Sequence, residues 1–551
     1  MARIQRTIVI TGGTVSGIGK GITAAALGNL LLRAGFSVSP VKADPYLNRD
    51  AGTMNPFQHG EVFVTEDGAE TDLDLGHYER FLDCHASQFS NFTSGAVFHS
   101  VMEHEREGEF LGKTIQIIPH VTDEIKRRIR LAGSEAGTDF LTVEIGGTVG
   151  DYEALPFIEA VRQLRHEEPA GRVLNMHVVK MDYIYPSDEG KTKPIQHAVT
   201  TLRGLGLQPD VLIVRCKRQI TVEELEKISL FTGVRPECVI AAPDADSLYD
   251  IPEIMAANGL VTAVLEYFKL QPQKTESGLA VAADWKRVRT LAASRNGLVK
   301  IGLVGKYLDQ GDAYLSVVEA VEHAGLAVGI DTKVVPVNAE SETLEEDLKE
   351  VDGIIVPGGF GSRGVEGKIT AIAYAREHKV PLLGICLGLQ LVVVEYARNV
   401  LGFRDAHSTE FDSKTTHPVI DYIPGQESIR RKGGTMRLGA YPAVLRENSL
   451  ALDLYTEWSP DVVRTESGRK LVSERHRHRY EVHPEYMAQL EAAGLHLSGL
   501  SPDGSLTEYV ELPTSVHPFF IATQAHPEFT SRPTKAQALF AGLVAAAKKR
   551  R

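Results

Sequence analysis

The stretch that decides the fold of the first half is TIVITGGTVSGIGKG, residues 7–21. Residues 7–10 form an apolar run typical of a buried strand, and a glycine-rich loop ending in Lys20 follows it. A helix is predicted to begin near Ile22. This order of elements predicts a phosphate site, because glycines let backbone N–H groups approach an anion and the helix adds the positive end of its dipole.

The loop differs from the common P-loop in two respects. Five residues separate Gly13 from Gly19, one more than usual, and Gly21 stands where a Ser or Thr is usual. Lys20 can still reach the outer phosphates of a nucleotide. Taken alone, the motif leaves a glycine-rich turn without a ligand as the alternative.

Acidic side chains suited to Mg²⁺ follow the loop. A nucleotide polyphosphate needs Mg²⁺, which prefers carboxylate oxygens, and candidates are Asp74 in the acidic run 65–74 and Glu144 at the end of an apolar run. In doubly wound sheets, ligands bind beyond the carboxyl ends of the strands, which favours Glu144 and also Lys42 at the end of the second predicted strand. KTKP, residues 191–194, offers two further cations. A solvated surface is the alternative for the acidic run and for KTKP.

The second half carries a candidate cysteine nucleophile. GICLG, residues 384–388, lies between an apolar strand and a helical run, which is the pattern of a nucleophile elbow, and the helix N-terminus favours the thiolate. His526 can serve as its base and Glu528 can orient the imidazole. PGGFG, residues 357–361, can supply backbone N–H groups for an oxyanion. An inert buried thiol is the alternative for Cys386 taken alone.

The order of apolar runs and helical patterns predicts an α/β protein of two domains with a doubly wound parallel sheet in the first. The polar stretch 271–278 lacks periodicity and predicts a linker, with domains at 1–270 and 298–551 and the linker at 271–297. The predicted strands are residues 7–10, 37–41, 140–145, 174–179 and 211–215 in the first domain, and 299–304, 353–356, 381–385 and 519–523 in the second.

Composition excludes several classes of protein. The 551 residues are 43% hydrophobic and 24% charged, as in soluble globular proteins. A net charge of −13 argues against a general nucleic-acid or anionic-membrane surface. No apolar run approaches the roughly 18–20 residues of a membrane helix, no signal peptide opens the chain, and the four cysteines form neither a CxxC pair nor a disulfide framework. We therefore expect a cytoplasmic protein.

Several motifs together carry a family resemblance. GICLG, PGGFG and HPE resemble class I (triad) glutamine amidotransferases, which release ammonia from glutamine. GEVFV at 60–64, HYERF at 77–81, EIGGTVGD at 144–151, KTKP and RHRHRY at 475–480 are similar to the CTP synthase family. The resemblance covers essentially the whole chain in the same order. Thr14 and Gly17 in the phosphate loop, and Arg49, differ from what the family usually shows.

The resemblance implies a fold and an activity. The fold is a P-loop-like amidoligase domain followed by a class I glutamine amidotransferase domain. The activity is the ATP-dependent amination of UTP to CTP with ammonia from L-glutamine, through UTP phosphorylated at O4. The family also implies Mg²⁺, activation by GTP, feedback inhibition by CTP, a homotetramer, and neither a nucleic-acid nor a membrane partner.

The resemblance also implies roles for individual residues, which fall into five groups. They are the catalytic Cys386, His526 and Glu528; the ATP-binding Gly17, Ile18, Gly19, Lys20, Gly21, Lys42 and Asp74; the UTP- or CTP-binding Ser16, Asp151, Tyr152, Glu153, Lys191, Thr192, Lys193, Pro194, Ile195, Gln196 and Lys227; the glutamine-binding Gly359, Leu387, Gly388, Leu389, Gln390, Glu410 and Arg479; and the metal ligands Asp74 and Glu144.

Two other functions remain as alternatives at this point. The first is a catalytically silent relative that acts as a nucleotide-regulated or filament-forming structural protein, although the charged and nucleophilic residues are all present. The second is another glutamine-dependent ligase that amidates a cobyrinate-like carboxylate. Such a ligase would not normally carry the RHRHRY segment.

Overall fold

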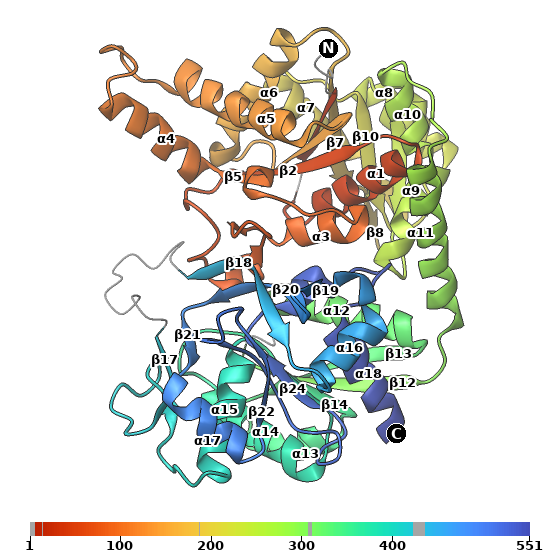
Figure 1. Ribbon diagram of the computed structural model, residues 1–551. Helices are drawn as coiled ribbons and strands as arrows, with labels where there is room; N and C mark the ends of the chain where they lie inside the picture. The colour runs from red at the N-terminus through yellow and green to blue at the C-terminus, as the bar shows by residue number, and fades with distance from the viewer. Residues whose placement is uncertain (1–5, 14, 187, 307–310, 423–435) are drawn as a thin grey trace. The chain divides into compact units, whose positions relative to one another are not determined.

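The computed structural model describes residues 6–13, 15–186, 188–306, 311–422 and 436–551. The chain forms two compact units, shown in Figure 1. The first unit comprises residues 1–51 and 74–289, and the second comprises residues 52–73 and 290–551. The short segment 52–73 therefore belongs to the second unit, although the domain boundaries predicted from the sequence place it in the first. Those boundaries stay a prediction.

The first unit is built on a parallel sheet of seven strands in the order β11-β10-β7-β1-β6-β2-β5. All five strands predicted for this half are present. The strands are β1 (Arg6–Gly12), β2 (Val38–Asp44), β5 (Asn91–Thr93), β6 (Phe140–Ile145), β7 (Val173–Lys180), β10 (Val211–Cys216) and β11 (Val239–Pro243), with a separate hairpin of β8 (Asp182–Ile184) and β9 (Glu189–Lys191).

Helices pack against this sheet in two groups. Val9, Val41 and Val143 of the sheet share one buried cluster with Ile125 and Phe157 of helices α5 and α6. Helix α1 packs against α3, α9 and α10. The helices are α1 (Lys20–Arg33), α3 (Asp74–Leu82), α4 (Ser94–Arg106), α5 (Thr122–Ala136), α6 (Leu155–Glu167), α7 (Lys193–Gly204), α8 (Val222–Thr232), α9 (Ile251–Ala257), α10 (Leu260–Tyr267) and α11 (Glu276–Ser294).

Helix α11 occupies most of the predicted linker. Its Trp285 is buried, donates from its indole Nε1 to the carbonyl oxygen of Tyr249, and packs against Phe81. One large aromatic side chain thus holds this helix against the first unit. The polar residues 271–278 ahead of the helix did not predict this packing.

The second unit contains a mixed sheet of ten strands in the order β13-β12-β14-β15-β24-β23-β22-β18-β20-β19. The five strands from β13 to β24 are parallel, and the rest are antiparallel. The strands are β12 (Leu298–Gly305), β13 (Asp331–Asn338), β14 (Gly353–Val356), β15 (Leu382–Ile385), β18 (Arg437–Leu445), β19 (Arg464–Glu466), β20 (Arg469–His478), β22 (His496–Leu500), β23 (Thr507–Glu511) and β24 (Phe520–Thr523).

Two buried clusters fill the two faces of this sheet. One contains Ile354 and Leu382 with residues of α14 and α15, and the other contains Ile355 and Leu383 with residues of α12 and α18, as the alternation of side chains along a strand requires. The helices are α12 (Leu315–Val328), α13 (Leu344–Lys349), α14 (Val365–His378), α15 (Leu387–Asn399), α16 (Leu450–Trp458), α17 (Pro484–Ala492) and α18 (Ala538–Arg550), and a small sheet joins β16 (His407–Ser408), β17 (Pro418–Tyr422) and β21 (Tyr480–Val482).

The segment 52–73 contributes helix α2 (Pro56–His59) and the hairpin of β3 (Phe63–Val64) and β4 (Glu70–Thr71) to the second unit. Backbone and ring contacts fix it there. Arg475 donates to the carbonyl oxygen of Val64 at 3.0 Å, and the rings of Phe63 and Phe529 meet edge to face at 5.0 Å. The segment is therefore an integral part of the second unit.

Within the described ranges, no single helix is long and apolar enough to cross a membrane, and one bent pair, Leu248–Ala257 with Leu260–Tyr267, meets the length and composition test.

Candidate functional site

Cys386 lies at the turn between β15 and α15, where the sequence predicts a nucleophile elbow. Its backbone has φ 53° and ψ −103°, a conformation that a residue other than glycine rarely adopts. The flanking glycines make the turn possible: a Cβ on Gly388 would lie 2.2 Å from the carbonyl oxygen of Val356, and one on Gly384 would lie 2.7 Å from the Cβ of Ala522. Packing thus holds the strained nucleophile in place.

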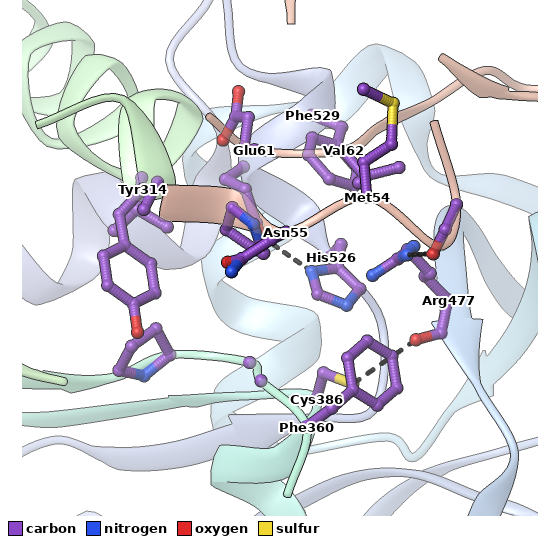
Figure 2. Close-up of a pocket in the computed structure, with 18 of the residues that line it drawn as sticks. Met54, Asn55, Glu61, Val62, Tyr314, Phe360, Cys386, Arg477, His526 and Phe529 are labelled. Atoms are coloured by element: carbon purple, nitrogen blue, oxygen red, sulfur yellow. Dashed lines mark hydrogen bonds and ion pairs between the residues drawn. The ribbon is translucent and has the colours of Figure 1, made fainter. Parts of the chain in front are cut away.

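His526 and Glu528 complete a triad with Cys386. Figure 2 shows Cys386 and His526 in the pocket. His526 and Glu528 follow β24, with Glu528 in the short helix η8 (Pro527–Thr530), and Nδ1 of His526 lies 2.7 Å from Oε1 of Glu528. Burial alone would lower the pKa of His526, but Glu528 and the Cys386 thiolate raise it to about 10. The arrangement therefore favours the imidazolium form of His526, a positive charge placed next to the nucleophile.

A cavity of about 430 Å³ opens over Cys386 (Figure 2). One wall comes from the loop 357–360 and another from residues 52–62 of the segment described above. Arg477 joins the two walls: it donates to Glu70 and to the carbonyl oxygen of Gly52, both at 2.9 Å, and its guanidinium lies over the ring of Phe360. The cavity is enclosed by residues far apart in the sequence.

The loop predicted to supply oxyanion donors does face the nucleophile. A Cβ on Gly358 would lie 2.8 Å from Cε1 of His526 and 3.5 Å from the Cβ of Cys386, so this backbone lies directly against the catalytic pair. The N–H groups of Leu387 and Gly388, the first two of α15, have no carbonyl partner within their own helix. Backbone N–H groups from both sides can thus converge on an oxygen attached to the attacked carbon.

The residues predicted to bind glutamine come from four segments of the second unit. Leu387, Gly388, Leu389 and Gln390 form the start of α15, directly after Cys386. The remaining three, Gly359, Glu410 and Arg479, come from the loop after β14, from the turn after β16 and from the turn between β20 and β21. Glu410 accepts a hydrogen bond from the N–H of Gly361 at 3.3 Å, which ties it to the oxyanion loop.

Sequence reasoning missed four side chains around this centre. Gln524 donates to Sγ of Cys386 at 3.8 Å, and Lys306 donates to the carbonyl oxygen of Phe360. The other two are Arg477, described above, and Lys368, which donates to the carbonyl oxygen of Pro357 at 3.1 Å. Gln524 lies two residues before the HPE motif and Arg477 lies within RHRHRY, so both had a usable signal, whereas no local pattern marks the two lysines.

In the first unit, the phosphate loop connects β1 to α1 as predicted. Gly19 caps α1 with φ 90°, and Lys20 is buried, with its ammonium donating to the carbonyl oxygen of Gly147 at 2.8 Å. A Cβ on Gly21 would lie 2.1 Å from Oδ1 of Asp74, so glycine at this position lets the helix approach that carboxylate. Gly17 has φ 65° and open space around it, and Thr14 lies outside the described residues.

Lys42, Asp74 and Glu144 meet at the carboxyl ends of β2 and β6 and the start of α3. The ammonium of Lys42 lies 2.8 Å from Oε1 of Glu144 and also contacts Asp74, and Tyr78 donates to Glu144. Burial raises the pKa of Glu144. Burial would raise the pKa of Asp74, but the nearby charges of Lys42, His77 and Lys20 and the hydrogen bond from Lys42 together lower it. Two carboxylates thus converge on one cation.

These carboxylates fit a magnesium ion in their chemistry, because hard oxygen ligands already surround a positive group here. Across the described part of the chain, however, no three His, Cys, Asp or Glu side chains form a ready metal site. A metal bound by Asp74 and Glu144 would take its other ligands from phosphate and water, which is the usual way that Mg²⁺ is held.

A second cavity, of about 650 Å³, lies beside the phosphate loop. Val15, Ser16 and Gly17 line one side of it, and Arg215, which forms an ion pair with Asp244 at 3.2 Å, lines another. Its position next to the loop gives room for the nucleoside part of a nucleotide whose phosphates lie at the loop.

The other residues predicted to bind UTP or CTP lie on separate elements of the first unit. Residues 191–196 span the end of β9 and the start of α7, Lys227 is exposed on α8, and Asp151, Tyr152 and Glu153 are exposed before α6. Within the described residues, no hydrogen bond or ion pair joins 151–153 to 191–196. The single chain therefore does not show these residues as one assembled site.

The fold and the triad define a class I glutamine amidotransferase unit joined to a P-loop-like α/β unit. Residues 6–270 match the family described as "CTP synthase N-terminus", and residues 311–546 match the family described as "Glutamine amidotransferase class-I". A CTP synthase of Methanopyrus kandleri is 52% identical over 550 residues, covering 98% of this chain and 99% of that protein. A CTP synthase of Bacillus subtilis is 48% identical over 547 residues, covering 98% of each.

A solved structure, the Trypanosoma brucei CTPS glutaminase domain with bound acivicin, is 38% identical, covers 46% of this chain and 94% of its own, and has a TM-score of 0.40. The two full-length similarities settle the classification. This chain belongs to the CTP synthase family, the glutamine-hydrolysing ligases that convert UTP to CTP.

Proposed function

We propose that this chain makes CTP from UTP, ATP and L-glutamine, with ammonia released in the second unit and consumed in the first. One observation carries the proposal: the same chain holds a Cys386–His526–Glu528 triad and, at a phosphate loop, a cluster of the buried Lys20, Lys42 and Glu144 with the half-buried Asp74. Neither site alone would account for a glutamine-dependent ligase.

In the second unit, the thiolate of Cys386 attacks the side-chain amide carbon of glutamine. The carbonyl electrons move to oxygen, and backbone N–H groups of the loop 357–361 and of Leu387 stabilise the resulting anion. His526 then gives a proton to the departing nitrogen, which leaves as ammonia. Water, deprotonated by the same imidazole, hydrolyses the thioester to glutamate. Glu528 keeps the imidazole oriented and stabilises its positive form.

Residues around the thiol are suited to hold glutamine itself. Glu410 supports the amino-acid ammonium and Arg479 the carboxylate, as the chemistry of opposite charges requires. The structure near the thiol supports the assignment for Gly359, Leu387, Gly388, Leu389 and Gln390, which surround Cys386 on two sides.

In the first unit, O4 of UTP attacks the γ-phosphorus of ATP, the uracil ring gives up its N3 proton, and ADP leaves. Ammonia then adds at C4 of the phosphorylated uracil, phosphate departs with the C4–O4 bond electrons, and loss of a proton from nitrogen gives CTP. Lys20 and Lys42 stabilise the charge on the transferring phosphoryl group, since positioning and charge neutralisation supply most of the catalysis in such transfers. Mg²⁺ held by Asp74 and Glu144 would neutralise phosphate charge when bound.

The nucleotides are assigned by charge and position. ATP places its phosphates at residues 17–21 and its nucleoside in the 650 Å³ cavity beside the loop. UTP binds through Ser16, residues 191–196 and Lys227. CTP shares the phosphate contacts of UTP and adds the segment 151–153, which makes it a feedback inhibitor. Activation by GTP, a homotetrameric assembly and a cytoplasmic location follow from the family resemblance.

One assay tests the proposal. The purified protein is incubated with UTP, ATP and Mg²⁺, together with either glutamine or ammonium, and the nucleotides are separated. We expect CTP with both nitrogen sources, and equimolar ADP. A protein that forms glutamate from glutamine but never forms CTP would contradict the assignment of the first unit.

A further inference from the structure

Lys368 is a buried lysine that the proposed reaction does not yet use. It lies in the first turn of α14 and is only 1% exposed. Val365, Ile369 and Ile372, on the same face of the helix, are buried as well. An amine placed in an apolar face costs free energy unless it is compensated, so the position calls for an explanation.

The surroundings of Lys368 provide little compensation for its charge. Its Nζ donates to the carbonyl oxygen of Pro357 at 3.1 Å, and among the described residues no carboxylate forms an ion pair with it. Burial and the neighbouring Lys306 lower the pKa of Lys368 to about 7, while the thiolate of Cys386 favours its charged form. The negative charge that stabilises this amine therefore belongs to the reaction centre.

The hydrogen bond to Pro357 also fixes the direction of a peptide group. In a trans peptide the C=O and the following N–H point in opposite directions, and the Pro357–Gly358 bond is not among the cis bonds of the described chain. The loop 358–359 lies between two neighbours: a Cβ on Gly359 would be 3.9 Å from Nζ of Lys368, and one on Gly358 would be 2.8 Å from His526. Lys368 thus contacts this loop on both sides of Gly358, the residue that lies against His526.

We propose that Lys368 is a positioning residue of the glutaminase reaction, which holds the Pro357 carbonyl so that backbone N–H groups of the loop 358–359 face the developing oxyanion. The inference rests on the proposed glutaminase function of Cys386. Lys306 does the same at the far end of the loop, where it donates to the carbonyl oxygen of Phe360. A loop held by its carbonyl groups presents its N–H groups without reorganisation during the reaction.

The test replaces the amine by a side chain of similar length and no donor, Lys368→Met. Lys349→Met, at an exposed lysine of α13, is the matched control. Because the oxyanion forms only in the transition state, kcat for glutamine hydrolysis should fall about tenfold to a hundredfold in Lys368→Met, while KM changes less than about threefold. Ammonia-dependent CTP formation should be unchanged.

An aldehyde analogue of glutamine separates positioning from simple packing. Its adduct with Cys386 carries the same oxyanion, so its inhibition constant should rise by the same factor as kcat falls. Product glutamate, which lacks that oxyanion, should bind as it does to the unmodified protein. A kcat within about threefold of the unmodified value, or an unchanged inhibition constant for the aldehyde, would overturn the proposal.

Lys368→Gln covers the case in which the methionine variant does not fold. Its amide nitrogen stops one bond short of the lysine nitrogen, so kcat should fall as in Lys368→Met, and a folded glutamine variant with unchanged kcat would refute the role. If the unmodified protein hydrolyses no glutamine at all, the proposed function fails instead. The two failures are therefore distinguishable.

Discussion

The triad of the second unit and the lysine–carboxylate cluster of the first unit are both buried near the carboxyl ends of parallel strands, but their charges are arranged differently. In the triad, Glu528, His526 and Cys386 form a chain in which each group prepares the next. In the cluster, Lys42 is neutralised directly by Asp74 and Glu144. The first arrangement is ready to react with a neutral amide.

The second arrangement must change when its ligand binds. A triphosphate brings several negative charges, so Lys42 can leave the carboxylates for phosphate oxygens, and the carboxylates are then available to a metal. This difference predicts that the triad loses its activity when the nucleophile is removed. The lysine–carboxylate cluster should lose its activity when any one of its charged side chains is removed. The predictions below test that contrast, beginning with the largest effect.

Cys386→Ala should abolish glutamine-dependent CTP formation, with a loss on the order of 10⁴-fold or more, because no other thiol can form the thioester. Ammonia-dependent CTP formation should continue at nearly the normal rate. Steady-state assays with glutamine and with ammonium measure both activities. Loss of both in a folded variant would mean that the two sites do not divide the work as proposed.

Lys20→Ala and Glu144→Ala should each lower CTP formation from either nitrogen source by about a hundredfold or more, which corresponds to about 2.8 kcal/mol at ~1.4 kcal/mol per tenfold. Glutamine hydrolysis measured without nucleotides should be unchanged in both. Near-normal ammonia-dependent rates in either variant would place the ATP site elsewhere.

Much of both sites could be predicted because their signals are local. The elbow at Cys386 is encoded by glycines two residues away on each side, and packing explains both, since a Cβ on Gly384 or Gly388 would clash. The phosphate loop before Lys20 is similar. In each case, the residues that shape the backbone stand beside the residue that performs the chemistry.

Long-range contacts could not be predicted in the same way. The segment 52–73 joins the second unit through Arg475 and Arg477, which lie some four hundred residues further along the chain. Lys368 has the sequence context of an ordinary helix residue, and only its burial behind Pro357 marks it. Helix α11 is held by the single buried Trp285. Such contacts exist only after folding.

Glu528→Gln should reduce glutamine hydrolysis by roughly tenfold to a hundredfold, because the imidazole loses the charge that stabilises its protonated form. Ammonia-dependent synthesis should not change. Hydrolysis and synthesis measured side by side check both expectations, and an undiminished hydrolysis rate would remove Glu528 from the triad.

The same variant tests the pH dependence of stability. The pKa of His526 is raised from 6.5 to about 10 in the folded protein, so the stability that it contributes is complete below pH 6.5 and is lost as the pH rises through about 10. The difference in melting temperature between the unmodified protein and Glu528→Gln should therefore be largest at or below pH 6.5 and should shrink as the pH rises through about 10. Thermal unfolding between about pH 6 and pH 10.5 measures it, and a constant difference would contradict the assignment.

The smallest effect on activity is expected from the residues predicted to bind UTP and CTP, which the described chain does not bring together as one site. If UTP and CTP share the phosphate contacts of residues 191–196 while their bases diverge, Lys193→Ala should weaken both nucleotides. Glu153→Ala should raise the inhibition constant of CTP by about tenfold or less and leave the KM for UTP nearly unchanged. The reason is charge: a second site for a tetra-anion would need its own cations, and the exposed segment 151–153 carries two carboxylates and no cation.

Steady-state kinetics with UTP and CTP varied together test whether the two nucleotides share this site. Inhibition that is noncompetitive with UTP, or a Glu153 variant that loses UTP as badly as CTP, would exclude the shared site and would leave the feedback nucleotide to a separate part of the protein.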